Sequence, residues 1–210
     1  MTRRALFLMP SDRMGGAERI VRTIAKEAAG SGHFDHVDVF VLCWSRSGTL
    51  DELEAMGNVT AHYTEAPKEQ RGILAMARFM MRQQYDLVFS SATHINALAS
   101  LMRRTGRLKT KRLVSRESTM IFERDFGLAG HVFKALYRAY GAQDLIICQT
   151  DRMRESLDHH TKGRFRPLLR TIPNPIDFDR ITAGTAQPVP CTVEQIPHEQ
   201  TKVVWCGRLS

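Results

Sequence analysis

The stretch ALFLMPSDRMGGAER, residues 5–19, decides the fold. Its first part, Ala5–Met9, is an unbroken apolar run, which is typical of a strand covered on both faces. Its last part enters the segment Ala17–Ala29, where apolar side chains recur at the spacing of one helix face. The adjacent glycines Gly15 and Gly16 lie between these two segments. The local order is therefore strand, glycine-rich turn, helix.

Predicted strands and helices continue to alternate as far as residue 159. Further strands are predicted over Val37–Leu42, Val59–Tyr63, Leu87–Ser90, Arg112–Ser115 and Leu145–Cys148. Helices are predicted over Leu50–Met56, Ile73–Gln84, Asn96–Arg104, His131–Tyr140 and Asp151–His159. This alternation predicts an α/β fold, a Rossmann-like and mainly parallel sheet with helices on both faces.

The composition changes after Ile172. Pro173 and Pro175 interrupt both helix and regular strand pairing, and residues 178–201 are rich in Pro, Thr and Gln without periodicity. A strand candidate, Lys202–Cys206, follows and leads into a glycine. We therefore expect a first domain over residues 1–178, a linker over 179–201 and the start of a truncated second domain over 202–210.

The charge of the chain indicates the kind of partner. With 210 residues and ordinary apolar and charged fractions, the chain can bury a substantial core. Its formal charge of +8 favours an anionic partner, which is phosphate, nucleic acid or an acidic membrane surface. The sequence has no recognisable reading helix and no stacking sheet with exposed aromatic residues, so we expect no nucleic acid.

The cysteines and the apolar runs indicate the compartment. The 4 cysteines form neither a CxxC pair nor a regular series, which predicts a reducing compartment and no metal site. The first apolar run is shorter than the roughly 7 to 15 residues of a signal-peptide core. No stretch approaches the ~18 apolar residues of a membrane span. We expect a cytoplasmic protein, with peripheral attachment at the inner face of the cytoplasmic membrane left open.

The glycine pair predicts a ligand site. A strand-to-helix turn in a parallel sheet points to the crevice at the carboxyl ends of the strands. The unpaired backbone N–H groups at the helix start can hold a phosphate or a polar sugar there, and Gly15 and Gly16 allow a close approach. The alternative is an ordinary tight turn. Neither a GxGxxG dinucleotide fingerprint nor a GxxxxGK phosphate loop is present.

Five segments together resemble a known family. They are GGAER (Gly15–Arg19), YDLVFSSATHINALA (Tyr85–Ala99), VSRES (Val114–Ser118), IPNPID (Ile172–Asp177) and VVWCGRLS (Val203–Ser210). In order and spacing they resemble the retaining, nucleotide-sugar-dependent glycosyltransferases of family 4, which have the two-domain GT-B fold. The resemblance implies that the chain is the N-terminal, acceptor-binding half of such a hexosyltransferase. It further implies a nucleotide-sugar donor as a substrate, no metal or other cofactor, and no activity for this fragment alone.

The resemblance also implies which residues form the site. Substrate-binding residues would be Gly15, Gly16, Glu18, Arg19, His94, Asn96, Arg116 and Glu117. The residues alone leave other interpretations open, because a histidine after a strand is often a helix cap and an adjacent Arg–Glu pair is often a surface couple. Arg208 matches an arginine that binds the donor diphosphate in the family. We nominate no catalytic base.

Two basic features could contact an anionic membrane. Around the predicted helix Ile73–Gln84, three arginines (Arg71, Arg78 and Arg82) fall on one narrow stripe, and apolar residues cover most of the remaining surface. The segment Arg103–Arg112 carries six cations in ten residues. The simpler interpretation is a solvated helix face and a solvated loop. The alternative is docking to an anionic leaflet, which would suit a lipid-linked acceptor.

The expected function follows from the resemblance. We expect an acceptor-binding domain of a glycosyltransferase in surface glycan or glycolipid assembly. The alternative is a non-catalytic Rossmann-like module that binds an anionic, phosphorylated ligand at the glycine turn.

Overall fold

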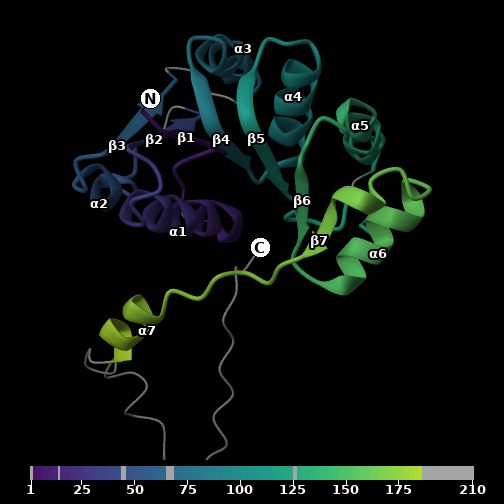
Figure 1. Ribbon diagram of the computed structural model, residues 1–210. Coiled ribbons are helices and arrows are strands. Elements are labelled where there is room, and N and C mark those ends of the chain that lie inside the picture. The colour runs from purple at the N-terminus through teal and green to yellow at the C-terminus, as the bar shows by residue number, and fades with distance from the viewer. Residues whose placement is uncertain (1, 14, 44–45, 65–68, 125–126, 186–210) are drawn as a thin grey trace, which may run out of the picture. The chain divides into compact units, whose positions relative to one another are not determined.

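A parallel sheet organises the protein (Figure 1). The computed structural model describes residues 2–13, 15–43, 46–64, 69–124 and 127–185. Within these residues the strands form one seven-stranded sheet in the order β3-β2-β1-β4-β5-β6-β7, and every neighbouring pair is parallel. The strands are β1 (Arg4–Met9), β2 (His36–Val41), β3 (Val59–Tyr63), β4 (Gln84–Ser90), β5 (Lys109–Arg116), β6 (Leu145–Cys148) and β7 (Leu169–Thr171). The predicted Rossmann-like α/β fold is confirmed.

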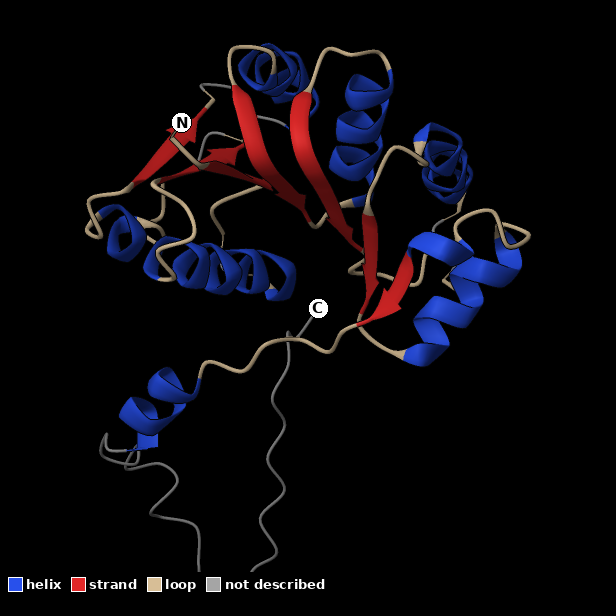
Figure 2. Cartoon of the chain, viewed as in Figure 1, coloured by secondary structure: helices blue, strands red, loops and turns tan. Residues whose placement is uncertain are grey.

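Helices connect successive strands (Figure 2). The helices of the sheet domain are α1 (Gly16–Gly30), α2 (Asp51–Glu54), α3 (Glu69–Met80), α4 (Thr93–Arg104), α5 (Leu128–Leu136) and α6 (Asp151–His160), with the short 3₁₀ helices η1 (Tyr137–Ala139) and η2 (Arg166–Leu168). None of the helices that the structure describes combines the length and apolar character needed to cross a bilayer.

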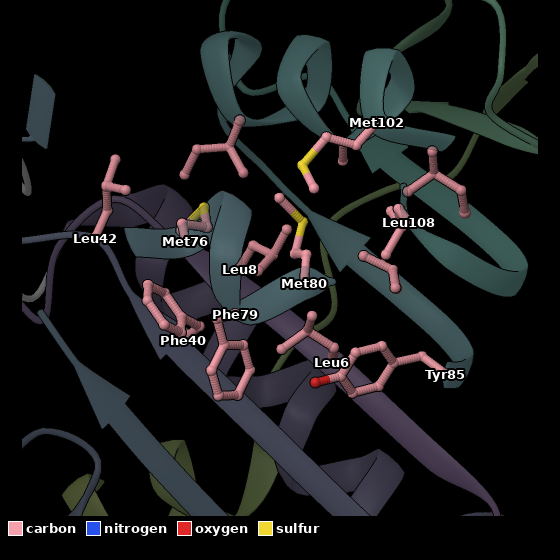
Figure 3. Packing of buried hydrophobic residues seen from close by; sticks show 14 residues of the cluster. Leu6, Leu8, Phe40, Leu42, Met76, Phe79, Met80, Tyr85, Met102 and Leu108 are labelled. Carbon is pink, nitrogen blue, oxygen red and sulfur yellow. The ribbon is translucent and has the colours of Figure 1, made fainter. Parts of the chain in front are cut away.

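Both faces of the sheet are covered because successive side chains of each strand point to opposite faces. In β1, Leu6 and Leu8 pack with residues of α3 and α4, whereas Phe7 packs with residues of α1 and α2. Figure 3 shows the first of these clusters, in which the rings of Phe40 and Phe79 have centroids 4.8 Å apart. Burial of each large apolar side chain stabilises the fold by about 1.5–3 kcal/mol. This two-sided burial explains why Ala5–Met9 of β1 forms a continuous apolar run.

The direction of the connections reverses at β1. This strand pairs with β2 on one side and with β4 on the other, with Leu8 opposite both Phe40 and Ser90. The loops that follow β1 and β4 therefore leave in opposite directions, which is where ligands of open parallel sheets bind. The glycine turn and the start of α4 thus flank the same crevice end of the sheet.

Several element boundaries differ from the prediction by about three or four residues, and one strand was not predicted. Helix α3 begins and ends about four residues earlier than expected, because Gln84 already belongs to β4 and Gly72 fits within the helix. A side chain at Gly72 would collide with the Leu42 carbonyl, so glycine lets α3 lie close to the end of β2. Strand β7 was not predicted, since its three residues include Arg170 and show no apolar run.

The chain divides after Pro175. The second unit contains α7 (Phe178–Thr185), a helix in a segment for which no periodic structure was expected. The predicted strand Lys202–Cys206 and Arg208 lie outside the described residues.

Candidate functional site

The glycine turn leaves the N-terminus of α1 open. Gly15 precedes the helix with φ −98° and ψ 171°, and no side chain caps the first turn. Any residue can adopt this backbone conformation, so the turn itself does not require glycine. Gly16 is exposed, and a Cβ atom added there would meet nothing within 4 Å. The space beside Gly16 is therefore available to a ligand.

The next two predicted residues lie in the first turn of α1. The Glu18 carboxylate folds back over Gly15, where a side chain on the glycine would meet it. A negative charge at this position is stabilised by the positive end of the helix. Arg19 is exposed, and its backbone N–H donates to the Gly15 carbonyl at 3.0 Å, the first hydrogen bond of the helix.

A buried aspartate in the loop before the glycine turn connects this loop to neighbouring segments. Asp12 is 0% exposed, and its Oδ2 accepts hydrogen bonds from the Ser47 N–H at 2.7 Å and the Tyr63 hydroxyl at 3.3 Å. Burial, and then the nearby Asp12 charge, raises the pKa of the Tyr63 hydroxyl, so it stays a donor. Asp12 thus joins the loops after β1 and β2 to the end of β3. Asp12 was not among the predicted site residues, although a polar residue in the loop after β1, three positions beyond the end of the strand, was a usable signal.

Asn96 holds strands together and does not line the crevice. It is 0% exposed, its Oδ1 accepts from the Ser90 hydroxyl at 2.5 Å, and its Nδ2 donates to the Arg116 carbonyl at 3.1 Å. The same Nδ2 lies 3.2 Å from Oε1 of Glu117. These bonds join the ends of β4 and β5. They correct the expectation that the Asn96 amide faces a ligand.

Glu117 is a buried carboxyl group at the end of β5. It is 1% exposed, and it accepts hydrogen bonds from the Tyr137 hydroxyl at 2.6 Å and the Tyr140 hydroxyl at 2.8 Å. Burial raises the pKa of Glu117, and the hydroxyl donors and the Asn96 amide oppose the rise. The expected exposure of this residue to substrate, and the alternative of a surface couple with Arg116, are both wrong because the side chain is enclosed.

Arg116 connects several strand ends. It is 3% exposed, and its guanidinium donates to the Ser91 hydroxyl at 2.7 Å and to Asn174 Oδ1 at 2.6 Å. Asn174 Nδ2 donates in turn to Gln149 Oε1 at 3.1 Å. Burial lowers the pKa of Arg116, whereas the neighbouring Glu117 charge raises it. We call Ser91, Arg116, Asn174 and Gln149 the strand-end row, since they follow or end β4, β5, β7 and β6.

The remaining predicted residue of this edge, His94, lies in the first turn of α4 and is partly buried. It stays a candidate for contact with substrate. No group of three His, Cys, Asp or Glu side chains within the described part of the chain is placed to hold a metal ion.

A hollow opens directly after Glu117. Its volume is about 390 Å³, and it is lined by Ser118, Thr119, Met120, Glu123, Arg124 and Met153. Hydroxyl groups that can bond a sugar and methionine side chains that can pack on its apolar faces line the same space. We call it the hydroxyl hollow. None of its residues was among the site residues predicted from the sequence.

The two predicted basic features differ in how exposed their arginine side chains are. Arg71, Arg78 and Arg82 are exposed along α3 and the turn after it. In the segment Arg103–Arg112, however, Arg103 is half-buried and pairs with Asp144, and it also donates to the Ala142 carbonyl at 2.8 Å. Arg103 is therefore a part of the fold, which corrects its assignment to a membrane-facing loop. The segment leads into the amino end of β5, the edge of the sheet opposite the candidate site.

Comparisons with known proteins identify the family. Residues 14–180 match the model of Glycosyltransferase Family 4. A crystal structure of HepE from Anabaena in complex with UDP is similar, with a TM-score of 0.59 and 19% identity, over 84% of this chain and 45% of that chain. That identity shows the fold alone, and this chain spans less than half of that protein. No curated protein matches the chain. Because the family model covers most of its length, the chain belongs to glycosyltransferase family 4, and its sheet is the Rossmann-like N-terminal part of a GT-B fold.

Proposed function

We propose that the chain is the acceptor-binding domain of a nucleotide-sugar-dependent glycosyltransferase of the hexosyltransferase type, in surface glycan or glycolipid assembly. The observation that carries the proposal is the open N-terminus of α1 at the reversal point of a family 4 sheet. Backbone N–H groups there can bind sugar hydroxyls or phosphate oxygens without a charged side chain. Gly15, Gly16, Glu18, Arg19 and His94 are the proposed contacts.

The buried residues of the edge have a positioning role in this proposal. Glu117 is enclosed by tyrosine hydroxyls and cannot reach a substrate, so it is unsuited to act as a base. Arg116 keeps the strand ends in register. We assign no protein nucleophile, and we assign the donor diphosphate to Arg208 and to the rest of a second domain.

An anionic membrane surface is a second proposed partner, and α3 supports it. Leu74 is 58% exposed and Met81 is 48% exposed, on the side of the helix that also carries Arg71 and Arg78. Arginines beside exposed apolar side chains are the pattern of a helix that lies on a bilayer. The segment Arg103–Arg112 is less suitable, because it precedes and enters the amino end of β5, at the edge of the sheet opposite the acceptor edge.

Binding measurements on the 210-residue chain test the proposal. Saturation-transfer NMR should detect glycan acceptors in a glycan panel, whereas nucleotide diphosphates and nucleotide sugars should bind only weakly. Micromolar binding of a nucleotide sugar would mean that the donor site has been assigned to the wrong domain. Binding of small phosphorylated ligands without any glycan would favour the non-catalytic alternative.

A further inference from the structure

The Asp38 carboxylate of β2 binds side chains from neighbouring strands. It is 1% exposed, and its Oδ2 accepts a 2.8 Å hydrogen bond from the Arg4 guanidinium of β1. Its Oδ1 accepts a 2.7 Å hydrogen bond from Nε2 of His62 on β3, and Nε2 of His36 on β2 lies 3.5 Å away. The side chains of His62 and His36 are 31% and 28% exposed, so protons from solvent reach both. We call these four residues the histidine cluster.

The histidine cluster lies against the last turn of α3. The ring of His62 packs on the ring of Phe79, with centroids 4.5 Å apart. Arg78, Met81 and Arg82 are exposed at this end of the helix, where the Arg82 N–H donates to the Phe79 carbonyl at 3.1 Å. A helix with its side chains is about 10–12 Å wide, which is close to the ~10 Å over which charges act in about 0.1 M salt. A charge on His62 can therefore act on a membrane surface that contacts the outer face of α3.

The buried acid of the histidine cluster stays ionised. Burial opposes ionisation of Asp38, but the hydrogen bonds from His62 and Arg4 outweigh it and hold the pKa of this carboxyl below its ordinary value. Burial, and then the charge of Asp38, raises the pKa of the nearby Tyr85 hydroxyl, which therefore stays neutral. Histidine is the side chain whose charge changes between about pH 5 and 8. The two histidines are thus left as the groups of the cluster that can take up a proton.

The fixed charges around the two histidines cancel. Among the described residues, the charged or titratable neighbours in the sheet are Arg4 of β1, Asp38 of β2, Tyr85 and Asp86 of β4, Lys111 of β5 and the exposed pair of Arg3 and Asp35. Arg4 balances Asp38, and Lys111 balances Asp86 at 2.6 Å. Protonation of either histidine therefore gives the cluster a positive charge that no acid in this list neutralises.

We infer that docking of α3 on an anionic membrane is coupled to protonation of His36 and His62. The inference rests on the proposed membrane contact and specifies how that contact is regulated. An anionic leaflet attracts protons as well as basic side chains, so the docked chain should hold more protons than the free chain. By linkage, the affinity for the membrane then rises as the pH falls.

The first experiment measures sedimentation over a pH series with vesicles of phosphatidylglycerol and phosphatidylcholine in equal parts. The affinity of the unmodified chain should rise about fivefold between pH ~8 and ~5.5, the effect of roughly one added charge near the leaflet. The variant His36→Gln/His62→Gln keeps amide donors for Asp38 but cannot be protonated, so it should lose most of this rise. The matched control His131→Gln/His159→Gln removes two exposed histidines of α5 and α6 and should keep the rise.

The second experiment measures proton uptake directly. In weakly buffered solution near pH ~7, addition of the anionic vesicles to the unmodified chain should raise the pH of the solution, whereas the variant His36→Gln/His62→Gln should not change it. The single variant His36→Gln leaves the 2.7 Å bond of His62 in place and should lose part of the uptake, which keeps the test decisive if the double variant does not fold.

The outcomes separate the coupling from the membrane contact. Affinity that does not depend on pH, equal losses in the two double variants, or docking without proton uptake overturns the coupling and leaves the contact standing. No sedimentation at any pH, or equal sedimentation with phosphatidylcholine alone, overturns both.

Discussion

The Arg116 guanidinium donates a 2.6 Å hydrogen bond to Asn174 Oδ1, which joins the end of β5 to the segment that follows β7. Asn174 also donates to Gln149, so one amide side chain serves two strand ends. The link crosses 58 residues of sequence.

The substitution Asn174→Ala should destabilise the sheet domain. It leaves the buried Arg116 without one acceptor and Gln149 without one donor, which costs about 1–3 kcal/mol of unfolding free energy. Urea denaturation followed by circular dichroism measures the loss. Asn174→Asp keeps an acceptor for the guanidinium and should lose less; an Ala variant as stable as the unmodified chain contradicts the link.

Replacing Glu117 should change how stability depends on pH. Burial raises the pKa of Glu117 above 4.5, so between 4.5 and the raised pKa the folded state holds more protons than the unfolded state. Stability then falls as pH rises through that window. Glu117→Gln has no such titration, so the variant should gain stability relative to the unmodified chain above pH 4.5 and show a constant difference below it. Urea denaturation over a pH series that starts below 4.5 tests this, and a difference independent of pH refutes it.

The substitution Gly16→Val should reduce glycan binding while the fold stays intact. The added side chain has open space in the free protein but would occupy the ligand's place at the start of α1. We expect a loss of about tenfold or more, equivalent to at least roughly 1.4 kcal/mol. Gly30→Ala is the control at the other end of α1, where a Cβ atom makes an ordinary 3.8 Å contact with Met56. Undiminished glycan binding by Gly16→Val would leave the turn without a role in recognition.

Two neighbouring arginines should respond differently to the same change. Arg103→Gln removes an ion pair with Asp144 and a bond to the Ala142 carbonyl, so it should cost about 1–3 kcal/mol of stability. Arg104 is exposed, and Arg104→Gln should be within about 0.5 kcal/mol of the unmodified chain. Thermal and urea unfolding of the two variants compare them directly. Similar stabilities would show that Arg103 is an ordinary surface charge.

Neutralising α3 should weaken binding to anionic vesicles. The variant Arg71→Gln/Arg78→Gln removes two exposed charges, each worth about 1 kcal/mol near an anionic leaflet, so sedimentation with the vesicles should fall substantially. Added salt should weaken binding of the unmodified chain in the same assay. Arg107→Gln/Lys109→Gln should have the smaller effect. A larger effect of this second pair would assign the contact to the loop, and equal binding to neutral vesicles would exclude an electrostatic contact.

The sheet could be predicted from the sequence because its central strands are buried on both faces. The strands β3 (Val59–Tyr63) and β6 (Leu145–Cys148) also have the predicted bounds, since β-branched, aromatic and apolar residues between turn residues define them locally. The three residues of β7 carry no such run, and only pairing with β6 makes them a strand. The start of α3 depends on the contact of Gly72 with β2, which the local pattern does not contain.

The sequence predicted at which edge of the sheet the site residues lie, but not whether their side chains are buried or exposed. The sequence located Asn96, Arg116 and Glu117 at the correct edge, because strand ends are visible as the ends of apolar runs. Their burial depends on Tyr137 and Tyr140, about twenty residues further along the chain, whose hydroxyl groups enclose the carboxyl group. Partners that far apart leave no local pattern. The hydroxyl hollow was missed for the same reason, since Met153 comes from α6.

The strand-end row has a mechanical consequence. Strand β7 contributes only three residues to the sheet, and its partners along β6 are equally few, so a pull on the chain beyond Pro175 would detach it easily if the ladder were its sole attachment. Asn174 lies between Pro175 and β7 in the chain, and its side chain forms hydrogen bonds with Gln149 and Arg116. Arg116 is tied in turn to Ser91. Tension on the segment is thereby spread over the ends of four strands, and the first bonds to carry it are those of side chains at the crevice.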